Sequence, residues 1–165
     1  MAKPILLVED DQNDVLFMQM ALESAGIDAP LEIAPDGQRA LDYLREALRP
    51  AEKGQPPPSV MICDLRLPRV PGDELLKWVR QQPAYVNLPV IVLTSSNAET
   101  DVERAYRHGA SSYIIKPANP VELNKIAALI RDYWVHGEKP PGAVDQYTQP
   151  MPSEALSTEG VQVVT

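Results

Sequence analysis

The sequence predicts an α/β domain in which one parallel β-sheet carries helices on both faces. Five short apolar runs are each followed by a stretch with helical periodicity, and this alternation fills about the first 135 residues. Several of these runs are apolar at every position, which is typical of strands buried on both faces. With 165 residues the chain is too short for a closed barrel of eight such units, so we expect an open sheet.

The first unit combines the apolar run 5–8 with a helix that begins near Asp14. The expected core side of this helix recurs at helical spacing and consists of Phe17, Met18, Ala21, Leu22 and Ala25. Acidic residues suit the first turn of a helix, which explains Asp11 and Asp14. Glu9 and Asp10 belong instead to the end of the strand.

Val15, Leu16 and Met20 lie off that core side, and we expect them to be exposed. Single apolar residues are common on protein surfaces, but three of them beside an acidic cluster favour a docking face. This side of the helix is therefore predicted to contact a partner protein.

The second unit is the weaker apolar run 31–34, the turn Asp36-Gly37 and a helix that ends near Arg49. Its core side consists of Ala40, Leu41, Leu44 and Leu48. The proline-rich segment 50–58 is too stiff for a helix and too short for a domain linker, so we expect a loop.

The third unit places Asp64 directly after the apolar run 60–63, and Pro68 then prevents further strand pairing. In open parallel sheets, reaction sites lie just beyond the carboxyl ends of the strands, so Asp64 is a candidate for chemistry. An N-cap or turn aspartate is the alternative interpretation. Pro71-Gly72 precedes the third helix, whose core side consists of Leu75, Leu76 and Val79.

The fourth unit is the run 90–94 with a helix from near Asn97 to about His108. The fifth unit is the run 112–115, and its helix begins at Pro120. The core side of this last helix consists of Leu123, Ile126, Ala127, Ile130 and Tyr133.

A change of composition near Trp134 divides the chain into a domain over residues 1–136 and a tail over residues 137–165. The tail contains four prolines and few apolar residues, so we expect it to be extended or disordered. Its segment 161–164 is able to pair as a strand. The tail is too short and irregular for a DNA-binding output domain, which indicates a single-domain protein.

The composition excludes several classes of function. A net charge of −8 argues against non-specific nucleic-acid binding, which requires a basic face. No apolar run is long enough to cross a membrane and the N-terminus lacks the apolar region of a signal peptide, so we expect a cytoplasmic protein. The single cysteine, Cys63, is predicted to be a buried thiol. His108 and His136 are far apart and have no cysteine cluster beside them, which excludes a zinc site.

The ends of the first, third, fourth and fifth strands carry Glu9, Asp10, Asp64, Thr94 and Lys116. Three carboxylates within about 4 Å repel one another strongly, so the cluster needs raised pKa values or a cation. Oxygen ligands without histidine or cysteine indicate Mg²⁺. A hydroxyl and an ammonium group suit a transferring phosphoryl group, with Asp64 as the nucleophile that forms an acyl-phosphate. We expect the Lys116–Pro117 peptide bond to be cis.

Four motifs in this order resemble the receiver domain of two-component response regulators, and the resemblance covers residues 3–135. The motifs are Leu-Val-Glu-Asp-Asp, Ile-Cys-Asp-Leu-Arg-Leu-Pro, Val-Leu-Thr-Ser and Tyr-Ile-Ile-Lys-Pro. The resemblance implies a flavodoxin-like (βα)5 fold with strand order 2-1-3-4-5. It also implies that the phosphohistidine of a sensor kinase phosphorylates Asp64, that Lys116 contacts the phosphoryl group, and that no external substrate is turned over.

The same resemblance implies roles for five further positions. Glu9 and Asp10 match the metal-binding acids of the family, in which the first acid is more commonly Asp. Arg66 matches the residue that binds Mg²⁺ through its backbone carbonyl. Thr94 and Tyr113 match the switch pair that responds to the phosphoryl group.

A narrower resemblance is to the small response regulators that are paired with bacterial and cyanobacterial phytochromes. It rests on Ala-Leu-Asp-Tyr-Leu, the long loop 50–58, Leu-Thr-Ser-Ser-Asn and the Tyr-Trp pair at 133–134. This resemblance implies a phytochrome as the partner kinase. It also implies a homodimer through the fourth helix, fifth strand and fifth helix, with the tail clasping that face.

Three other interpretations compete with this one. A flavodoxin-type FMN binder needs a phosphate loop rich in Ser, Thr and Gly where this chain has the acids 9–11. A haloacid-dehalogenase-type phosphatase needs a second acid where Arg66 stands. The remaining alternative is a receiver-like interaction module that is never phosphorylated, and the complete set of site residues argues against it.

Overall fold

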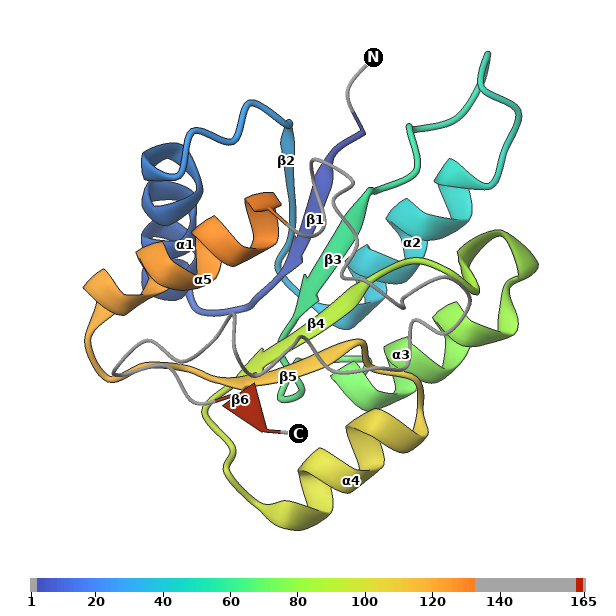
Figure 1. The fold of residues 1–165 in the computed structure, drawn as a ribbon. Coiled ribbons are helices and arrows are strands. Elements are labelled where there is room, and N and C mark those ends of the chain that lie inside the picture. Colours follow the sequence, from blue (N-terminus) through green and yellow to red (C-terminus); the bar gives the residue numbers. More distant parts are fainter. Residues whose placement is uncertain (1–2, 133–162, 165) are drawn as a thin grey trace.

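The computed structural model describes residues 3–132 and 163–164, which form a six-stranded sheet with helices packed on both faces (Figure 1). The strands are β1 (Ile5–Val8), β2 (Leu31–Ala34), β3 (Val60–Cys63), β4 (Val90–Thr94), β5 (Ser112–Ile115) and β6 (Val163–Val164). The α-helices are α1 (Gln12–Ser24), α2 (Gly37–Ala47), α3 (Gly72–Gln81), α4 (Glu99–Arg107) and α5 (Leu123–Ile130). Two 3₁₀ turns, η1 (Pro83–Tyr85) and η2 (Pro120–Glu122), precede β4 and α5.

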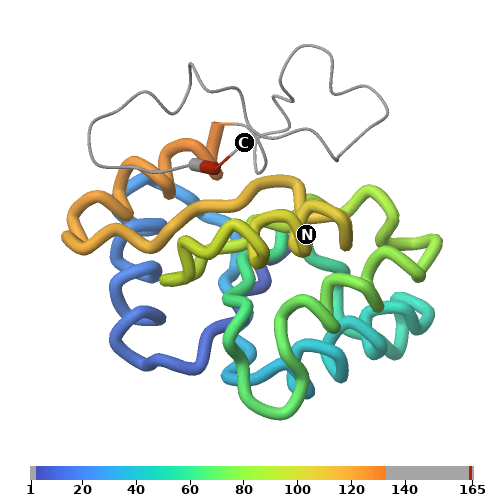
Figure 2. Tube along the Cα trace, turned by 90° about the horizontal axis from the view of Figure 1, so that it is seen from below, coloured from blue at the N-terminus to red at the C-terminus, as the bar shows by residue number. Residues whose placement is uncertain are grey.

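The strand order confirms the predicted flavodoxin-like fold. The order is β2-β1-β3-β4-β5-β6, and the five strands from β1 to β5 are parallel. Helices α1 and α5 cover one face, and Figure 2 shows the sheet between them and the pair α2 and α3. This order brings the carboxyl ends of β1, β3, β4 and β5 to one edge, which is where parallel sheets place their reaction sites.

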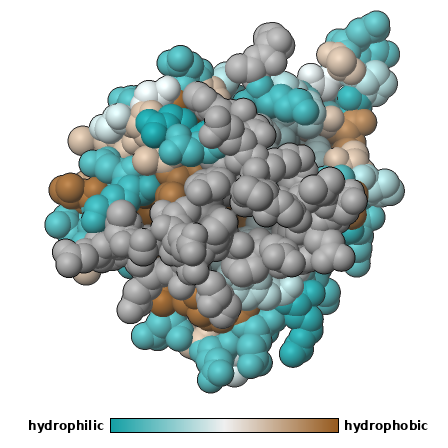
Figure 3. Space-filling model, viewed as in Figure 1, coloured by the Kyte–Doolittle hydropathy of each residue, from teal (hydrophilic) through white to brown (hydrophobic). Residues whose placement is uncertain are grey.

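Alternate residues of β1, β3 and β4 supply two separate cores, which explains why these runs are apolar on both faces. In β1, Leu6 and Val8 belong to the core under α2, α3 and α4, whereas Ile5 and Leu7 belong to the core under α1 and α5. All four side chains are buried. The outer surface of α4, at the bottom of the view in Figure 3, is by contrast mainly hydrophilic.

Helix α1 begins two residues earlier than predicted because Asp11 caps it. The Asp11 side chain accepts hydrogen bonds from the backbone N–H groups of Asn13 and Asp14, at 2.8 and 3.0 Å. This cap orients the first turn of α1 toward the carboxyl ends of the strands, so that Asp14 faces the site.

The exposure of α1 agrees only in part with the prediction. Leu16 and Met20 are exposed, at 53% and 55%, as expected. Val15 is half-buried against the core under α1 and α5, so its predicted exposure is wrong. Phe17 was expected in the core but is 36% exposed, because the buried side of α1 consists of Met18, Ala21 and Leu22.

The last third of the chain differs from the prediction in several details. All peptide bonds within the described residues are trans, so the predicted cis bond before Pro117 is wrong. Pro120 opens the turn η2, and α5 itself begins at Leu123. The predicted pairing of the chain end is confirmed, because β6 runs antiparallel to β5. Tyr133, Trp134 and most of the tail lie outside the described residues, and none of the described helices is long and apolar enough to cross a membrane.

Arg80, at the end of α3, joins two loops through backbone carbonyls, the one before β4 and the one before β5. Its Nε donates to the carbonyl of Gly109 at 2.9 Å, and its Nη1 donates to those of Tyr85 and Leu88 at 2.9 and 2.7 Å. Burial of the guanidinium lowers the pKa of Arg80 to about 10. Arg80 is the described donor to the Gly109 and Leu88 carbonyls, whereas the Tyr85 carbonyl also accepts a hydrogen bond from the Leu88 N–H at 3.0 Å.

We predict that Arg80→Met lowers the free energy of unfolding by about 2 kcal/mol, since it removes a donor to three carbonyls. Urea denaturation measures the difference. Arg107→Met on the exposed surface of α4 is the matched control and should change stability by less than about 0.5 kcal/mol. Equal stability of the two variants would show that Arg80 does not tie the loops together.

Candidate functional site

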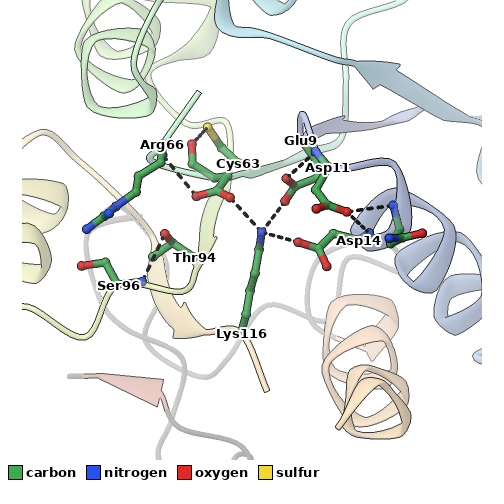
Figure 4. A network of polar contacts seen from close by, with 10 residues as sticks. Glu9, Asp11, Asp14, Cys63, Arg66, Thr94, Ser96 and Lys116 are labelled. Carbon is green, nitrogen blue, oxygen red and sulfur yellow. Dashed lines mark hydrogen bonds and ion pairs between the residues drawn. The ribbon is translucent and has the colours of Figure 1, made fainter. Parts of the chain in front are cut away.

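The ammonium group of Lys116 lies at the centre of the site and contacts three carboxylates (Figure 4). Its Nζ atom is 2.7 Å from Glu9 Oε2, 2.7 Å from Asp14 Oδ2 and 2.8 Å from Asp64 Oδ2. Glu9 and Asp64 are buried, whereas the side chain of Asp14 is 39% exposed. The structure therefore brings Glu9, Asp64 and Lys116 together as predicted, and adds Asp14.

The sheet itself sets the spacing of these groups. The backbone N–H of Asp64 donates to the Val8 carbonyl at 3.1 Å, which aligns the ends of β3 and β1. The N–H of Lys116 donates to the Thr94 carbonyl at 2.8 Å, which aligns the ends of β5 and β4. Gly72 opens α3 against Asp64, where a Cβ would lie 2.2 Å from the Asp64 carbonyl oxygen.

Burial and charge act in opposite directions on the two central groups. Burial raises the pKa of Glu9 to about 7, against the lowering effect of the Lys116 hydrogen bond and charge. Burial would by itself lower the pKa of Lys116, but hydrogen bonds to Asp14, Asp64 and Glu9 outweigh it and raise that pKa. The ammonium is therefore charged at every physiological pH and holds the acidic cluster together.

Three acidic side chains at this edge offer the donor set of a hard divalent cation. Oxygen atoms of Glu9, Asp10 and Asp64 lie within 4.8 Å of one another, with Asp10 exposed at the mouth of the site. Mg²⁺ binds oxygen ligands at about 2.1 Å, so adjacent ligands are about 3 Å apart and opposite ligands about 4.2 Å apart. The three carboxylates are therefore near enough to share one ion after small movements of their side chains. The residues present thus fit such an ion.

Arg66 follows Asp64 by two residues and contacts it through the backbone. The Arg66 N–H donates to Asp64 Oδ1 at 3.2 Å, so the loop after β3 fixes the orientation of the carboxylate. The guanidinium of Arg66 points away from Lys116 (Figure 4). This orientation leaves only the Arg66 backbone near the acidic cluster.

Thr94 and Tyr113 are buried and are joined through Ser96, which the sequence did not single out. The Thr94 Oγ1 accepts a long hydrogen bond of 3.5 Å from the Ser96 N–H. The Tyr113 hydroxyl donates to the Ser96 carbonyl at 2.8 Å. The Ser96 hydroxyl donates to Asp101 Oδ2 on α4 at 2.5 Å. The loop between β4 and α4 is therefore tied to β5 and to the first turn of α4.

A cavity of about 200 Å³ opens beside the cluster, between α1 and the loop after β5. Asp14 and Lys116 form part of its polar wall, and Phe17 and Leu123 form part of its apolar wall. The first-turn position of Asp14 was the only sequence signal for its role, and helix capping accounted for it equally well. Phe17 was missed because its spacing matched the core side of α1.

Comparison with known proteins agrees with this geometry. Residues 5–128 match the family of response regulator receiver domains. The response regulator Rcp1 of Synechocystis sp. is 34% identical over 141 residues, which are 86% of this chain and 95% of that protein. The probable methanogenesis regulatory protein FilR2 of Methanothrix harundinacea is 36% identical over 138 residues, which are 84% of this chain and 87% of that protein.

Two solved structures show the same arrangement. The Mn²⁺-bound form of Rcp1 has a TM-score of 0.73 and 34% identity, and the match covers 85% of this chain and 99% of that one. The phosphorylated cyanobacterial phytochrome response regulator RcpA has a TM-score of 0.73 and 31% identity, covering 81% of this chain and 94% of that one. The similar structures thus include one with a bound metal ion, that of Rcp1, and one of a phosphorylated protein, that of RcpA.

We predict that Lys116→Met destabilises the fold increasingly as the pH rises. A carboxyl group with a raised pKa binds more protons in the folded than in the unfolded state, so its ionisation lowers stability above its unfolded pKa. Loss of the ammonium enlarges this effect for all three carboxylates. We expect the free energy of unfolding of Lys116→Met to be about 2 kcal/mol below that of the wild type at pH 8, and the difference to shrink toward pH 5. Urea denaturation at both pH values measures it.

The exposed Lys77 on α3 provides the matched control, because Lys77→Met removes the same charge outside the site. A deficit in Lys116→Met that is equal at pH 5 and pH 8 would contradict the assigned role of the ammonium.

Proposed function

Because this chain belongs to the response regulator receiver family, we propose that it accepts a phosphoryl group on Asp64 from a sensor histidine kinase. The observation that carries the proposal is the Asp64 carboxylate at the end of β3, held 2.8 Å from the Lys116 ammonium beside the acidic cluster. An oxygen of Asp64 attacks phosphorus as the bond from phosphorus to the kinase histidine breaks, and the imidazole leaves with the electron pair of that bond. The product is an acyl-phosphate on Asp64.

The neighbours of Asp64 have complementary roles in this transfer. Lys116 supplies positive charge to the phosphoryl oxygens, which carry the negative charge that develops in the transition state. The Thr94 hydroxyl lies at the end of the adjacent strand and donates to a phosphoryl oxygen once the group is attached. Thr94 and Tyr113 then act as the switch pair, with the Tyr113 ring inside the fold when Thr94 is drawn to the phosphoryl group.

Mg²⁺ is the cofactor of the proposed reaction. Glu9, Asp10 and Asp64 would hold it with carboxylate oxygens, and Arg66 with its backbone carbonyl. When bound, the ion neutralises charge on the phosphoryl oxygens. The fit of the three carboxylates to an octahedral ion and the Mn²⁺-bound form of Rcp1 support this assignment.

The exposed side of α1 is the proposed docking surface for the kinase. Leu16 and Met20 are half exposed and lie on the helix whose first turn supplies Asp14 to the site. Val15 contributes less to this docking surface than expected, because its side chain is half-buried. The similarity to the phytochrome response regulator RcpA supports a phytochrome as the kinase, which would place the protein in the cytoplasm, where ATP supplies the phosphoryl group.

We further propose a homodimer through α4, β5 and α5. Signalling would then proceed by contact between proteins, with the receiver domain over residues 1–136 and the tail over 137–165 as its parts. Of the tail, β6 is described and pairs with β5, the central strand of that face. The proposed dimer therefore has to accommodate β6 or displace it.

The alternative is a receiver-like module that binds partners without being phosphorylated. We predict that acetyl phosphate with Mg²⁺ adds one acid-labile phosphoryl group to the protein, and that Asp64→Asn abolishes the addition and keeps the fold, because the change is nearly isosteric. Intact-mass measurement detects the group. A wild-type protein without added mass would favour the alternative, and a phosphorylated Asp64→Asn variant would mean that another residue is the acceptor.

The affinity for Mg²⁺ should depend on pH through Glu9. Metal binding requires the ionised carboxylate, and a pKa of about 7 leaves Glu9 mostly protonated at pH 6 and mostly ionised at pH 8. We expect the dissociation constant to be about tenfold larger at pH 6 than at pH 8, as measured by titration calorimetry. Glu9→Gln should bind more weakly with little pH dependence. Equal dissociation constants for the wild type at both pH values would contradict the role of Glu9.

Docking through α1 predicts a difference between two phosphoryl donors. Leu16→Asp should slow transfer from the cognate kinase by about tenfold, because it places a charge in an apolar contact, and should leave phosphorylation by acetyl phosphate unchanged. Val86→Asp is the control, since Val86 is 52% exposed in the loop between η1 and β4, at the end of the sheet away from the site. Equal loss with both donors would instead indicate a damaged site.

A further inference from the structure

The chain end lies against the edge of β5. Strand β6 runs antiparallel to β5, with Tyr113 opposite Val164 and Ile114 opposite Val163 (Figure 1). The half-buried Val164 packs against the core under α2, α3 and α4. Backbone pairing and an apolar contact together resemble the way in which a peptide ligand adds a strand to a sheet.

Tyr106 of α4 connects the two strands through its hydroxyl group. The Tyr106 hydroxyl accepts a hydrogen bond from the Tyr113 N–H at 3.1 Å and donates one to the Val164 carbonyl. A side-chain hydroxyl thus bridges a donor of β5 and an acceptor of β6. Docking of β6 therefore fixes the position of the Tyr106 hydroxyl, which in turn accepts the hydrogen bond of the Tyr113 N–H.

Tyr113 in turn reaches the site. Its ring is fully buried and its hydroxyl donates to the Ser96 carbonyl, while the Ser96 N–H donates to the Thr94 hydroxyl. A continuous series of hydrogen bonds and one aromatic ring joins Val164 to Thr94. Each group in the series belongs to the described residues.

We propose that β6 is an intramolecular ligand of the β5 edge whose docking is coupled, through Tyr106 and Tyr113, to the phosphorylation of Asp64. The coupling rests on the proposed function, in which the ring of Tyr113 is buried when Asp64 is phosphorylated. Since β6 docks on the protein while Tyr113 is buried, phosphorylation strengthens the docking of β6. Reciprocity of linked equilibria requires that β6 in turn stabilises the phosphorylated state.

The first experiment compares the full chain with a chain that ends at Gly160 and therefore lacks β6. Amide hydrogen exchange of Tyr113, whose N–H points to the β6 side, should be about tenfold faster without β6. Tyr106→Phe, which removes only the bridging hydroxyl, should also accelerate this exchange. Tyr85→Phe is the matched control, because the Tyr85 hydroxyl donates to the Leu44 carbonyl of α2 and not to β5 or β6, so its loss should leave β5 exchange unchanged.

The second experiment measures the coupling. Acetyl phosphate with Mg²⁺ should slow β5 exchange in the full chain by about fivefold, with no change in Asp64→Asn or in the chain that ends at Gly160. Intact mass determines whether the phosphoryl group is present. Without added mass, the proposed function and the coupling both fail, and the truncation still decides whether β6 docks.

Three results would overturn the inference. Equal β5 exchange with and without residues 161–165 would show that β6 does not dock. Equal exchange in phosphorylated and unphosphorylated full-length protein would remove the coupling. Protection of β5 that disappears on dilution, together with a dimer by light scattering, would show that β6 docks on a second copy instead of its own chain.

Discussion

The structure depends on one electrostatic arrangement, in which a single ammonium group holds three carboxylates at the carboxyl edge of the sheet. Without Lys116, the acids from β1, α1 and β3 would repel one another in a partly buried site. Burial raises the pKa of Glu9 to about 7 even with this cation beside it, so further positive charge would stabilise the ionised carboxylate. The site is therefore suited to a divalent cation and to an electron-poor phosphorus centre.

In the proposed function, the sheet transmits the phosphorylation of Asp64 toward the surface of the protein. Asp64 follows β3, and β4 and then β5 are the next strands along the sheet. A change at Asp64 would therefore displace the end of β4 first and the end of β5 after it. Ser96 connects the sheet to α4, because it is hydrogen-bonded to Thr94 of β4, Tyr113 of β5 and Asp101 of α4. Movement of Thr94 therefore acts on the first turn of α4 and on the ring of Tyr113 together.

The outer edge of β5 is the surface at which β6 and the proposed second copy of the chain would compete. It carries β6 in this structure, and the proposed homodimer uses the same strand. An uncovered strand edge invites pairing with other chains, and β6 protects it. Under the proposed coupling, phosphorylation of Asp64 would favour the protected edge, and loss of the phosphoryl group would favour an edge that is free to pair with a partner.

The sequence by itself determined the alternation of strands and helices and most residues of the candidate site, because strands buried on both faces are apolar and the residues at their ends stand out as Glu9, Asp64, Thr94 and Lys116. The strand order was predicted from the resemblance to receiver domains, and the structure confirms it. Only the tertiary structure decided the role of Asp14, since a first-turn acid serves equally as a helix-capping charge until a lysine from another strand meets it. The bridge through Tyr106 was also invisible, because hydrogen bonds between residues 58 positions apart leave no periodic pattern in a sequence. Local patterns follow from local physics, whereas these contacts exist only after the sheet has assembled.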